Sequence, residues 1–523
     1  MGVVLAGLGA LVFGAHVRHG SLYYDDWYLS ADTHYHGYWA VVRATLEVNP
    51  RRPLGALQLP LLHAVFGMHV HVALAVAAGL RCLMAWCVFL LVRTLGVELL
   101  PAAAIAVLAL LFPFSDSNWL YSTGTQPTLA VVLYLLGATM ALRGMRASGR
   151  RSRALHAGAL ALYAASIVLY EIAAVAVALS GLLYVGVGSV SKASRRWALD
   201  ASVAIGLVLL ITSRLVALVP GHDVHRVQAA SGQLSHAGTI LHQSLLLLGS
   251  SVVPWAGGRT VGLLALAAVV VTALVVIRML PAGDDTRRQL TRWLVAAGAG
   301  LVFVEAGYFS LIPSESYYVP LQAGVGNRIN ALATVGYAVT LVSAAMIVGT
   351  LAARGLRRGR LTAAGVSLVL LVLPAVGYVQ RVRSDVRKWN RAAVAQSIVR
   401  HRLHRVLPAP GRRSTVVLFG SPGFIADGIP IFGASYDFEG AARLLWHDPS
   451  ISGVNVLRGT HLNCTPTGIR ASGVGASGAF PYDRLVFVDL PSGQTSPVRS
   501  RDSCERLVAR FPPGPLVGDV GYR

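Results

Sequence analysis

The sequence has few charged residues and almost no lysine. Charged side chains make up 13% of the 523 residues, and Lys192 and Lys388 are the only lysines. Such a composition excludes a disordered chain or a coiled coil, and four cysteines are too few for a disulfide framework. Apolar side chains are abundant instead, at 54% of all residues. The composition therefore predicts a membrane protein rather than several soluble domains.

Eleven apolar runs approach the ~20 residues needed to cross a hydrocarbon core of about 30 Å. Several are short and contain Pro or Gly, which membrane proteins tolerate where backbone lines a cavity or is covered by neighbouring helices. The first run lacks a basic segment before it, so we interpret it as a span and not as a cleaved signal peptide. We predict an α-helical polytopic membrane protein with about 11 transmembrane helices, at 3–17, 70–93, 98–114, 125–143, 154–169, 172–188, 197–218, 260–278, 292–312, 328–353 and 361–380.

Basic residues gather in four short, alternate loops, near 143–153, 192–196, 278–292 and 354–360. The loops between them carry few basic residues and contain the acids Asp116, Glu171, Asp223 and Glu315. Cytoplasmic loops are enriched in Lys and Arg, so this alternation predicts a cytoplasmic N-terminus, an outer first loop at 18–60 and an extracytoplasmic C-terminal segment. Because orientation explains the formal net charge of +22, we expect no nucleic-acid partner.

The sequence changes character after the last apolar run. Residues 385–406 mix arginines with apolar positions, which predicts an amphipathic helix on the outer headgroup surface. The ten basic residues at 381–413 favour the cytoplasm, but long segments cross membranes largely regardless of charge. The stretches VVLFG at 416–420 and LVFVDL at 485–490 are typical of buried strands. We predict a transmembrane domain, an amphipathic helix with its linker, and a small extracytoplasmic α/β domain, at 1–380, 381–410 and 411–523.

The most informative stretch follows the first apolar run and reads YYDDWY at 23–28. Adjacent carboxylates raise each other's pKa unless a cation, metal or substrate offsets their charge, so Asp25 and Asp26 indicate a functional site. We expect both acids to be exposed and to contribute little to folding; a solvated loop with interfacial aromatics is the alternative. Arg51 and Arg52 follow in the same loop, and arginine suits a phosphate or pyrophosphate ligand.

These features resemble the GT-C superfamily of integral-membrane glycosyltransferases, which use polyprenyl-phosphate-linked sugars. The resemblance rests on Asp25, Asp26 and Trp27, on Arg-Arg-Pro-Leu at 51–54, and on short, broken spans with outward acids. It implies that an Asp of the first outer loop is the catalytic base on the acceptor hydroxyl. The partners implied are a polyprenyl-phosphate sugar donor, an envelope glycan or glycolipid acceptor, and the lipid of a bacterial plasma membrane.

The chemistry of the residues agrees with that expectation. One carboxylate that removes a proton is enough for transfer with inversion, and an anionic phosphate leaving group requires cations rather than a general acid. The candidate cations are Arg51, Arg52 and Arg328. A divalent ion such as Mg²⁺, Mn²⁺ or Ca²⁺ is the alternative, with the carboxylates of Asp25, Asp26 and Asp116 as its ligands.

Further candidates lie in the later outer loops. Glu171 lies at the expected membrane boundary, where an ionisable side chain is costly and by default functional; a turn residue that reaches water is the alternative. Tyr317 and Tyr318 have rings suited to stacking on a sugar. Arg328 begins an apolar run, where it either reaches to the surface or binds a lipid phosphate. Glu305 lies inside an apolar run, where an ionisable side chain is again costly, but no neighbouring residue places it near the site.

Three other function classes suit the same spans. A transporter or flippase of lipid-linked precursors would require inverted repeats, which we do not find in the sequence. A non-catalytic scaffold would leave Asp25 and Asp26 unexplained. A lipid-linked glycan ligase or polymerase would share the topology and donor chemistry without requiring these carboxylates.

The four cysteines fall into two pairs. Cys82 and Cys87 lie within one apolar run and are expected to be buried thiols. Cys464 and Cys504 lie between polar residues in the segment predicted to be extracytoplasmic, where an oxidising compartment favours a disulfide; two free surface thiols are the alternative. No histidine pair has metal-ligand spacing together with a Cys or an acid, so we expect no zinc site.

Overall fold

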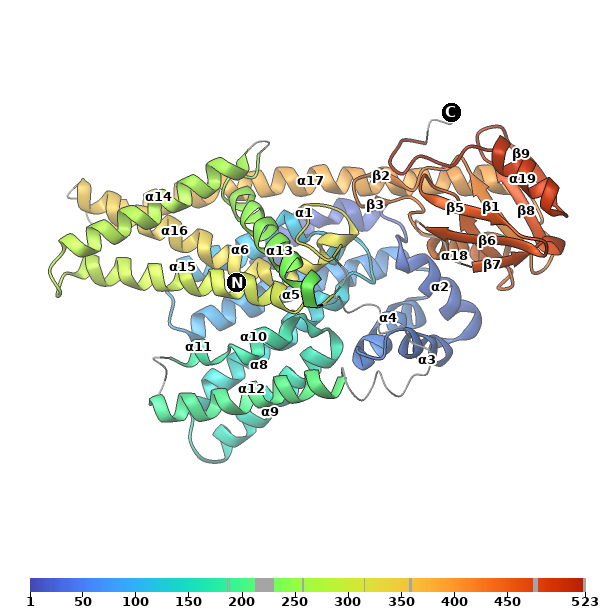
Figure 1. The fold of residues 1–523 in the computed structure, drawn as a ribbon. Coiled ribbons are helices and arrows are strands. Elements are labelled where there is room, and N and C mark those ends of the chain that lie inside the picture. Colours follow the sequence, from blue (N-terminus) through green and yellow to red (C-terminus); the bar gives the residue numbers. More distant parts are fainter. Residues whose placement is uncertain are drawn as a thin grey trace.

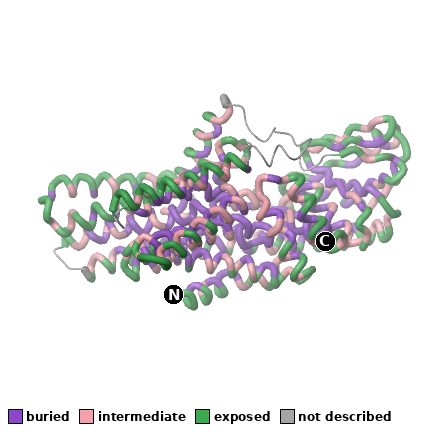
Figure 2. Tube along the Cα trace, turned by 90° about the horizontal axis from the view of Figure 1, so that it is seen from below, coloured by how far each residue is buried: buried purple, intermediate pink, exposed green. Residues whose placement is uncertain are grey.

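A computed structural model of the protein describes residues 1–185, 187, 189–211, 230–255, 258–314, 316–356, 360–473 and 478–520. Asp223, Glu315, Arg357 and Arg358, which contributed to the predicted orientation, lie outside these residues. Buried residues are concentrated in the interior of the helix bundle, and exposed residues lie on its outer surface (Figure 2). The part of the chain described has eight helices that are long and apolar enough to cross a membrane, α1 (Gly2–His19), α5 (Val70–Thr94), α8 (Thr125–Arg146), α9 (Gly149–Leu169), α14 (Gly258–Met279), α15 (Asp285–Phe309), α16 (Ala333–Gly355) and α17 (Arg360–Val406).

These eight helices coincide with eight of the eleven predicted spans, and the other three runs form shorter or more polar elements. Residues 98–114 contain α6 (Leu99–Leu111), which has 13 residues and ends before Pro113. Residues 172–188 are interrupted near Ser180 and give three short elements, η2 (Glu171–Ala173), α10 (Ala174–Ala178) and α11 (Gly181–Tyr184). The run 197–218 overlaps α12 (Val190–Leu210), and residues 212–218 lie outside the described ranges.

Two predicted loops are helical. The segment between the predicted spans 197–218 and 260–278, expected to face outward, contains α13 (Ala230–Val252). The first loop contains three helices, α2 (Asp25–His36), α3 (Tyr38–Val48) and α4 (Pro53–Phe66). Proline is well suited to the first position of a helix, as at Pro53, because its missing N–H would have no helical partner there.

The two ends of the helix bundle are formed by different elements (Figure 1). Helices α2, α3 and α4 lie beside the strands at one end, and the turn from α14 to α15 and the C-terminal end of α16 lie at the other. The second end carries basic residues, of which Arg354 pairs with Asp284 at 3.5 Å. The arrangement therefore separates the acid-containing first-loop helices from Arg354 and from the turn between α14 and α15, and the direction across the membrane stays a prediction.

The expected headgroup helix at 385–406 differs in the structure from the prediction. It continues the last apolar run without a break, as one helix of 47 residues, α17. Trp389, Val399 and Leu403 are fully buried in protein. Trp389 packs edge-on against the ring of Tyr23 with centroids 4.8 Å apart, and its carbonyl accepts a hydrogen bond from the Tyr23 hydroxyl. An amphipathic pattern does not distinguish a lipid surface from a protein surface, and here the apolar face contacts protein.

Strands form the C-terminal part of the chain. The main sheet has the order β4-β1-β8-β9, in which β1 is parallel to β4 and β8 and β9 is antiparallel to β8. Strand β1 is central and all five of its residues are buried, which is typical of a parallel strand covered on both faces. The two predicted strands are β1 and β8. The strands are β1 (Thr415–Phe419), β2 (Phe424–Ala426), β3 (Ile429–Pro430), β4 (Ser452–Asn455), β5 (Thr460–Cys464), β6 (Gly468–Gly473), β7 (Gly478–Pro481), β8 (Leu485–Asp489) and β9 (Gln494–Val498).

Alternate residues of β1 face two different cores, as the two-residue period of a strand requires. Val417 and Phe419 belong to a core formed within the strands themselves. Val416 and Leu418 belong to the large core that continues through α18 (Ser435–Trp446) into the helix bundle. One face of the sheet is therefore part of the packing of the whole molecule.

Helix α18 crosses α2 at close range. A Cβ atom on Gly440 would lie 2.5 Å from the backbone of Trp27, so only glycine fits at this crossing. Arg443 of α18 donates to the carboxylate of Asp32 in α2 at 2.6 Å, across 411 positions of sequence. These contacts fix the first-loop helices against the C-terminal strands.

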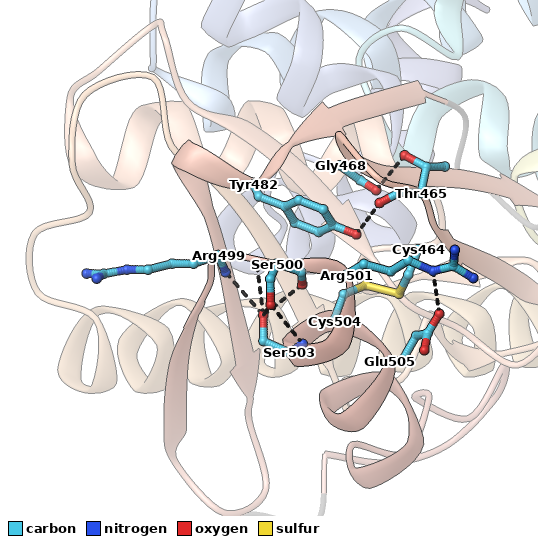
Figure 3. The surroundings of a disulfide bond; sticks show 10 residues. All are labelled: Cys464, Thr465, Gly468, Tyr482, Arg499, Ser500, Arg501, Ser503, Cys504 and Glu505. Atoms are coloured by element: carbon cyan, nitrogen blue, oxygen red, sulfur yellow. Dashed lines mark hydrogen bonds and ion pairs between the residues drawn. A yellow bond between two sulfur atoms is a disulfide. The ribbon is translucent and has the colours of Figure 1, made fainter.

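The expected disulfide joins Cys464 at the end of β5 to Cys504 in α19 (Arg501–Arg510), with Cα atoms 6.0 Å apart (Figure 3). The hydroxyl of Tyr482 donates to the carbonyl of Thr465, next to the bond, at 2.6 Å. The bond attaches α19 to the antiparallel sheet β5-β6-β7. The other two cysteines carry free thiols, with Cys87 buried and Cys82 partly buried.

Candidate functional site

Asp25 is the first residue of α2 and follows Tyr24, whose φ of 49° turns the chain into the helix. Its Oδ2 atom accepts a hydrogen bond from Nη1 of Arg328 at 3.3 Å, and the Tyr436 hydroxyl bonds the same carboxylate. The side chain is 30% exposed. Burial raises the pKa of Asp25, Arg328 opposes this shift and Asp26 adds to it, and the pKa stays above its ordinary value. A reachable carboxylate with a raised pKa is suited to accept a proton.

Asp26 has different surroundings, and the prediction that both acids are exposed is wrong. Its side chain is 1% exposed. The carboxylate accepts hydrogen bonds from the backbone N–H of Ser122 at 3.0 Å and of Thr123 at 2.8 Å, from the Ser122 hydroxyl at 2.8 Å, and from the Tyr23 N–H at 3.4 Å. Neighbouring residues of a helix point about 100° apart, so one faces the site and the other faces the core. Asp26 anchors the turn at 121–124 and is a positioning residue.

Asp26→Asn is expected to lower the free energy of unfolding by about 1.5–3 kcal/mol, the usual contribution of hydrogen bonds to a charged group. The N–H groups of Ser122 and Thr123 bond different carboxylate oxygens, and asparagine keeps only one acceptor oxygen, so its amide nitrogen leaves one of these donors without its acceptor. Thermal unfolding in detergent measures the effect, with Asp25→Asn as the matched control that should unfold near the wild-type temperature. Equal unfolding temperatures for Asp26→Asn and wild type would contradict the anchoring role.

The short 3-10 segment η5 (Val325–Ala331) places Arg328 against Asp25. The Asn327 side chain accepts from the Ser117 N–H at 3.1 Å, and the Asn118 amide donates to the carbonyl of Arg328 at 3.1 Å. The segment thus interlocks with α7 (Ser117–Leu120). Nη1 of Arg328 also donates to the Tyr121 hydroxyl at 2.9 Å. These bonds hold Arg328 in place before α16 (Ala333–Gly355). The predicted span therefore begins after Arg328 and not at it.

Arg52 and Glu171 form a second charged pair. Nε and Nη2 of Arg52 donate to the two carboxylate oxygens of Glu171 at 2.7 and 2.5 Å, and the guanidinium carbon lies 3.8 Å from the centre of the Tyr170 ring. Burial alone would raise the pKa of Glu171, but Arg52, with a contribution from Arg51, holds it below its ordinary value. Glu171 thus pairs with Arg52, and a role for it in orienting an acceptor or a cation stays a prediction.

Two tyrosines connect the charged pairs. The phenol groups of Tyr170 and Tyr318 lie within electrostatic range of both Arg52 and Arg328. The Tyr317 ring lies against that of Tyr318, with centroids 4.3 Å apart, and Tyr317 is 61% exposed. The fold therefore brings the predicted arginines and tyrosines into one region, and sugar stacking stays a prediction.

The C-terminal strands also contribute to this region, which the sequence did not reveal. Helix α18 joins the parallel strands β1 and β4 and therefore begins at the carboxyl edge of the sheet, where open α/β sheets bind ligands. The Tyr436 ring packs edge-on against Tyr24 with centroids 5.4 Å apart. Asp437 is fully buried beside it, and burial raises its pKa well above the ordinary value. At the same edge the carbonyl of Gly428 accepts from the N–H of Val325 in η5 at 2.8 Å.

Asp116 has separate surroundings. It is 1% exposed, and its Oδ1 atom accepts from the Asn327 amide at 2.7 Å. Burial, followed by the nearby charge of Asp385, raises the pKa of Asp116 well above its ordinary value. Across the residues that the structure describes, no group of three His, Cys, Asp or Glu side chains is placed to hold a metal ion. Asp25, Asp26 and Asp116 therefore do not form the expected set of ligands, and metal dependence stays a prediction.

No protein-family model matches the chain, and a search of curated proteins finds no match. The site itself combines a carboxylate suited to accept a proton, two partly exposed guanidinium groups and several phenol hydroxyls. This set suits a substrate that carries both a phosphate and hydroxyl groups.

Proposed function

We propose that the protein is a glycosyltransferase of GT-C type that moves a sugar from a polyprenyl-phosphate donor to an envelope glycan or glycolipid at the outer membrane face. Asp25 is the general base, and the reaction inverts the anomeric centre. The observation that carries the proposal is the 3.3 Å contact between a partly exposed carboxylate, Asp25, and the guanidinium of Arg328. A base and a phosphate-binding cation are thereby held side by side.

In the proposed step, the Asp25 carboxylate takes the proton from the acceptor hydroxyl. The acceptor oxygen forms a bond to the anomeric carbon, the bond from that carbon to the phosphate oxygen breaks, and the phosphate leaves with the electron pair. The transition state has oxocarbenium character, as in glycoside hydrolysis. Protonated Asp25 then loses its proton to water.

The leaving phosphate requires positive charge and not a proton. Arg328 donates to Asp25 and Tyr121 through one nitrogen, Nη1, and a guanidinium has five N–H donors. The remaining donors of Arg328 suit a phosphate oxygen. Arg52, held by Glu171, supplies a second cation near the same tyrosines.

The pH dependence of turnover tests this arrangement. Turnover requires ionised Asp25, so activity should fall as the pH drops through the pKa of Asp25, which lies above the ordinary value. Arg328 lowers that pKa, so Arg328→Gln should shift the acid limb to higher pH as well as weaken donor binding.

Steady-state transfer from a polyprenyl-phosphate sugar, measured at several pH values, provides this comparison. Arg288→Gln, at the opposite end of the bundle, is the matched control and should leave the profile unchanged. If activity of Arg328→Gln falls at the same low pH as in wild type, and only the apparent KM changes, Asp25 is not the titrating base.

A further inference from the structure

A cavity of about 390 Å³ lies at the edge of the sheet away from the candidate functional site. It is lined at the starts of the three parallel strands by Thr415 of β1, Ser452 of β4 and Arg484 directly before β8. Arg413 and Phe480 complete its main contacts. The volume suits one or two sugar rings, since ligand pockets begin near 300 Å³.

The strands and α17 show that this edge is distant from the bundle. Along α17, Gln396 donates to the carbonyl of Ile431 and Arg402 to that of Pro491, both beyond the carboxyl ends of the parallel strands. The helix then ends at Val406, and the Leu407 carbonyl accepts from Trp446 at the end of α18. Because α17 leads away from the apolar bundle, the amino edge of the sheet faces outward from it.

Two arginines, Arg413 and Arg484, line the cavity, whereas the acid Asp448 reaches it only through its hydrogen bond with the Ser450 hydroxyl. Arg484 pairs with an exposed neighbouring acid, Asp483, at 3.3 Å, and exposed ion pairs of this kind are weak. Arg413 has a φ of 61°, a left-handed backbone that costs a non-glycine residue free energy. Its N–H donates to the Ser450 hydroxyl at 2.9 Å, which holds this conformation and directs the chain into the cavity wall. A strained arginine kept at a cavity indicates a role for its side chain.

The chemistry of the lining identifies the class of ligand. Guanidinium groups bind carboxylate or phosphate oxygens, serine and threonine hydroxyls bind sugar hydroxyls, and the ring of Phe480 offers an apolar face to the C–H groups of a sugar. We propose that this cavity binds an anionic sugar unit, one that carries a carboxylate or a phosphate, separately from the candidate transfer site.

The test uses the full-length protein in detergent and saturation-transfer NMR with glucuronate, glucose 6-phosphate, glucose and inorganic phosphate as probes. Glucuronate or glucose 6-phosphate should bind more tightly than glucose and inorganic phosphate, and the two anionic sugars together identify which charged group is preferred. Arg413→Gly and Arg484→Gln should each weaken binding about tenfold or more, as expected for the loss of a charge-assisted hydrogen bond.

Arg413→Gly removes the side chain while relieving the positive φ, so loss of folding is not expected, and thermal unfolding checks this. Arg412→Gln is the matched control, because this neighbouring arginine does not line the cavity. Asp25→Asn should bind the anionic sugar like wild type, which keeps this proposal independent of the transfer reaction. The proposal is overturned if glucose or inorganic phosphate binds as tightly as the anionic sugars. It is also overturned if both cavity variants bind like wild type, or if neither anionic sugar binds at millimolar concentrations.

Discussion

Asp25→Asn is expected to lower sugar transfer by about 10²- to 10⁴-fold, the usual contribution of a general base. An asparagine has nearly the same shape but cannot accept the proton of the acceptor hydroxyl. Because Asp25 is partly exposed and its main partner is Arg328, the variant should still fold and bind the lipid-linked donor. Release of polyprenyl phosphate, measured with purified protein, gives the rate.

Two control variants separate a loss of catalysis from a loss of folding. Asp285→Asn replaces an acid that is 89% exposed at the other end of the bundle, and it should retain wild-type turnover. Asp26→Asn should lose stability, whereas Asp25→Asn should lose rate without losing stability. Full turnover by Asp25→Asn would exclude Asp25 as the base, and a matching loss of folding would show that its role is structural.

Loss of the disulfide is expected to destabilise the region around α19 by about 3 to 4 kcal/mol, from the entropy of closing a loop of 40 residues. Cys504 is fully buried, and the bond attaches α19 to β5. In Cys464→Ser and Cys504→Ser, peptides covering α19 should exchange amide hydrogens faster than in wild type. Hydrogen exchange followed by mass spectrometry measures this local opening.

Cys82→Ser is the control, because this thiol is free and lies in α5. It should leave exchange in α19 unchanged. Peptide mapping without reductant should also recover a linked pair of peptides that contain Cys464 and Cys504. Alkylation of both thiols in the unreduced protein would contradict the bond and weaken the extracytoplasmic assignment of the strands.

The elements that could be predicted are those whose residues carry a local pattern. Eight apolar runs lie in helices that are long and apolar enough to cross a membrane, and β1 and β8 were readable as short apolar runs. The run at 172–188 was misread because its composition is apolar although Ser180 and Gly181 interrupt it. The composition of a segment therefore predicts that it is apolar, but it does not predict that the segment forms one unbroken helix.

The parts of the site that were missed depend on contacts between distant segments. Tyr121 and Tyr436 both bond into the Asp25–Arg328 pair, yet neither has a local signal that separates it from an interfacial or surface tyrosine. Asp25 is partly exposed and Asp26 is buried because only one side of α2 contacts the turn at Ser122. Adjacent acids in a sequence cannot reveal this, because the distinction arises from tertiary packing.

The most direct test of the central claim is mass spectrometry of the lipids that co-purify with the wild-type protein, followed by incubation with a candidate acceptor. We expect a polyprenyl-phosphate sugar in the purified wild type, its conversion to polyprenyl phosphate on addition of the acceptor, and retention of the sugar-linked form in Asp25→Asn. Two results together would contradict the proposed transferase: a normally folded preparation that contains only phospholipids, and no consumption of polyprenyl-phosphate sugar when this donor is supplied with the acceptor.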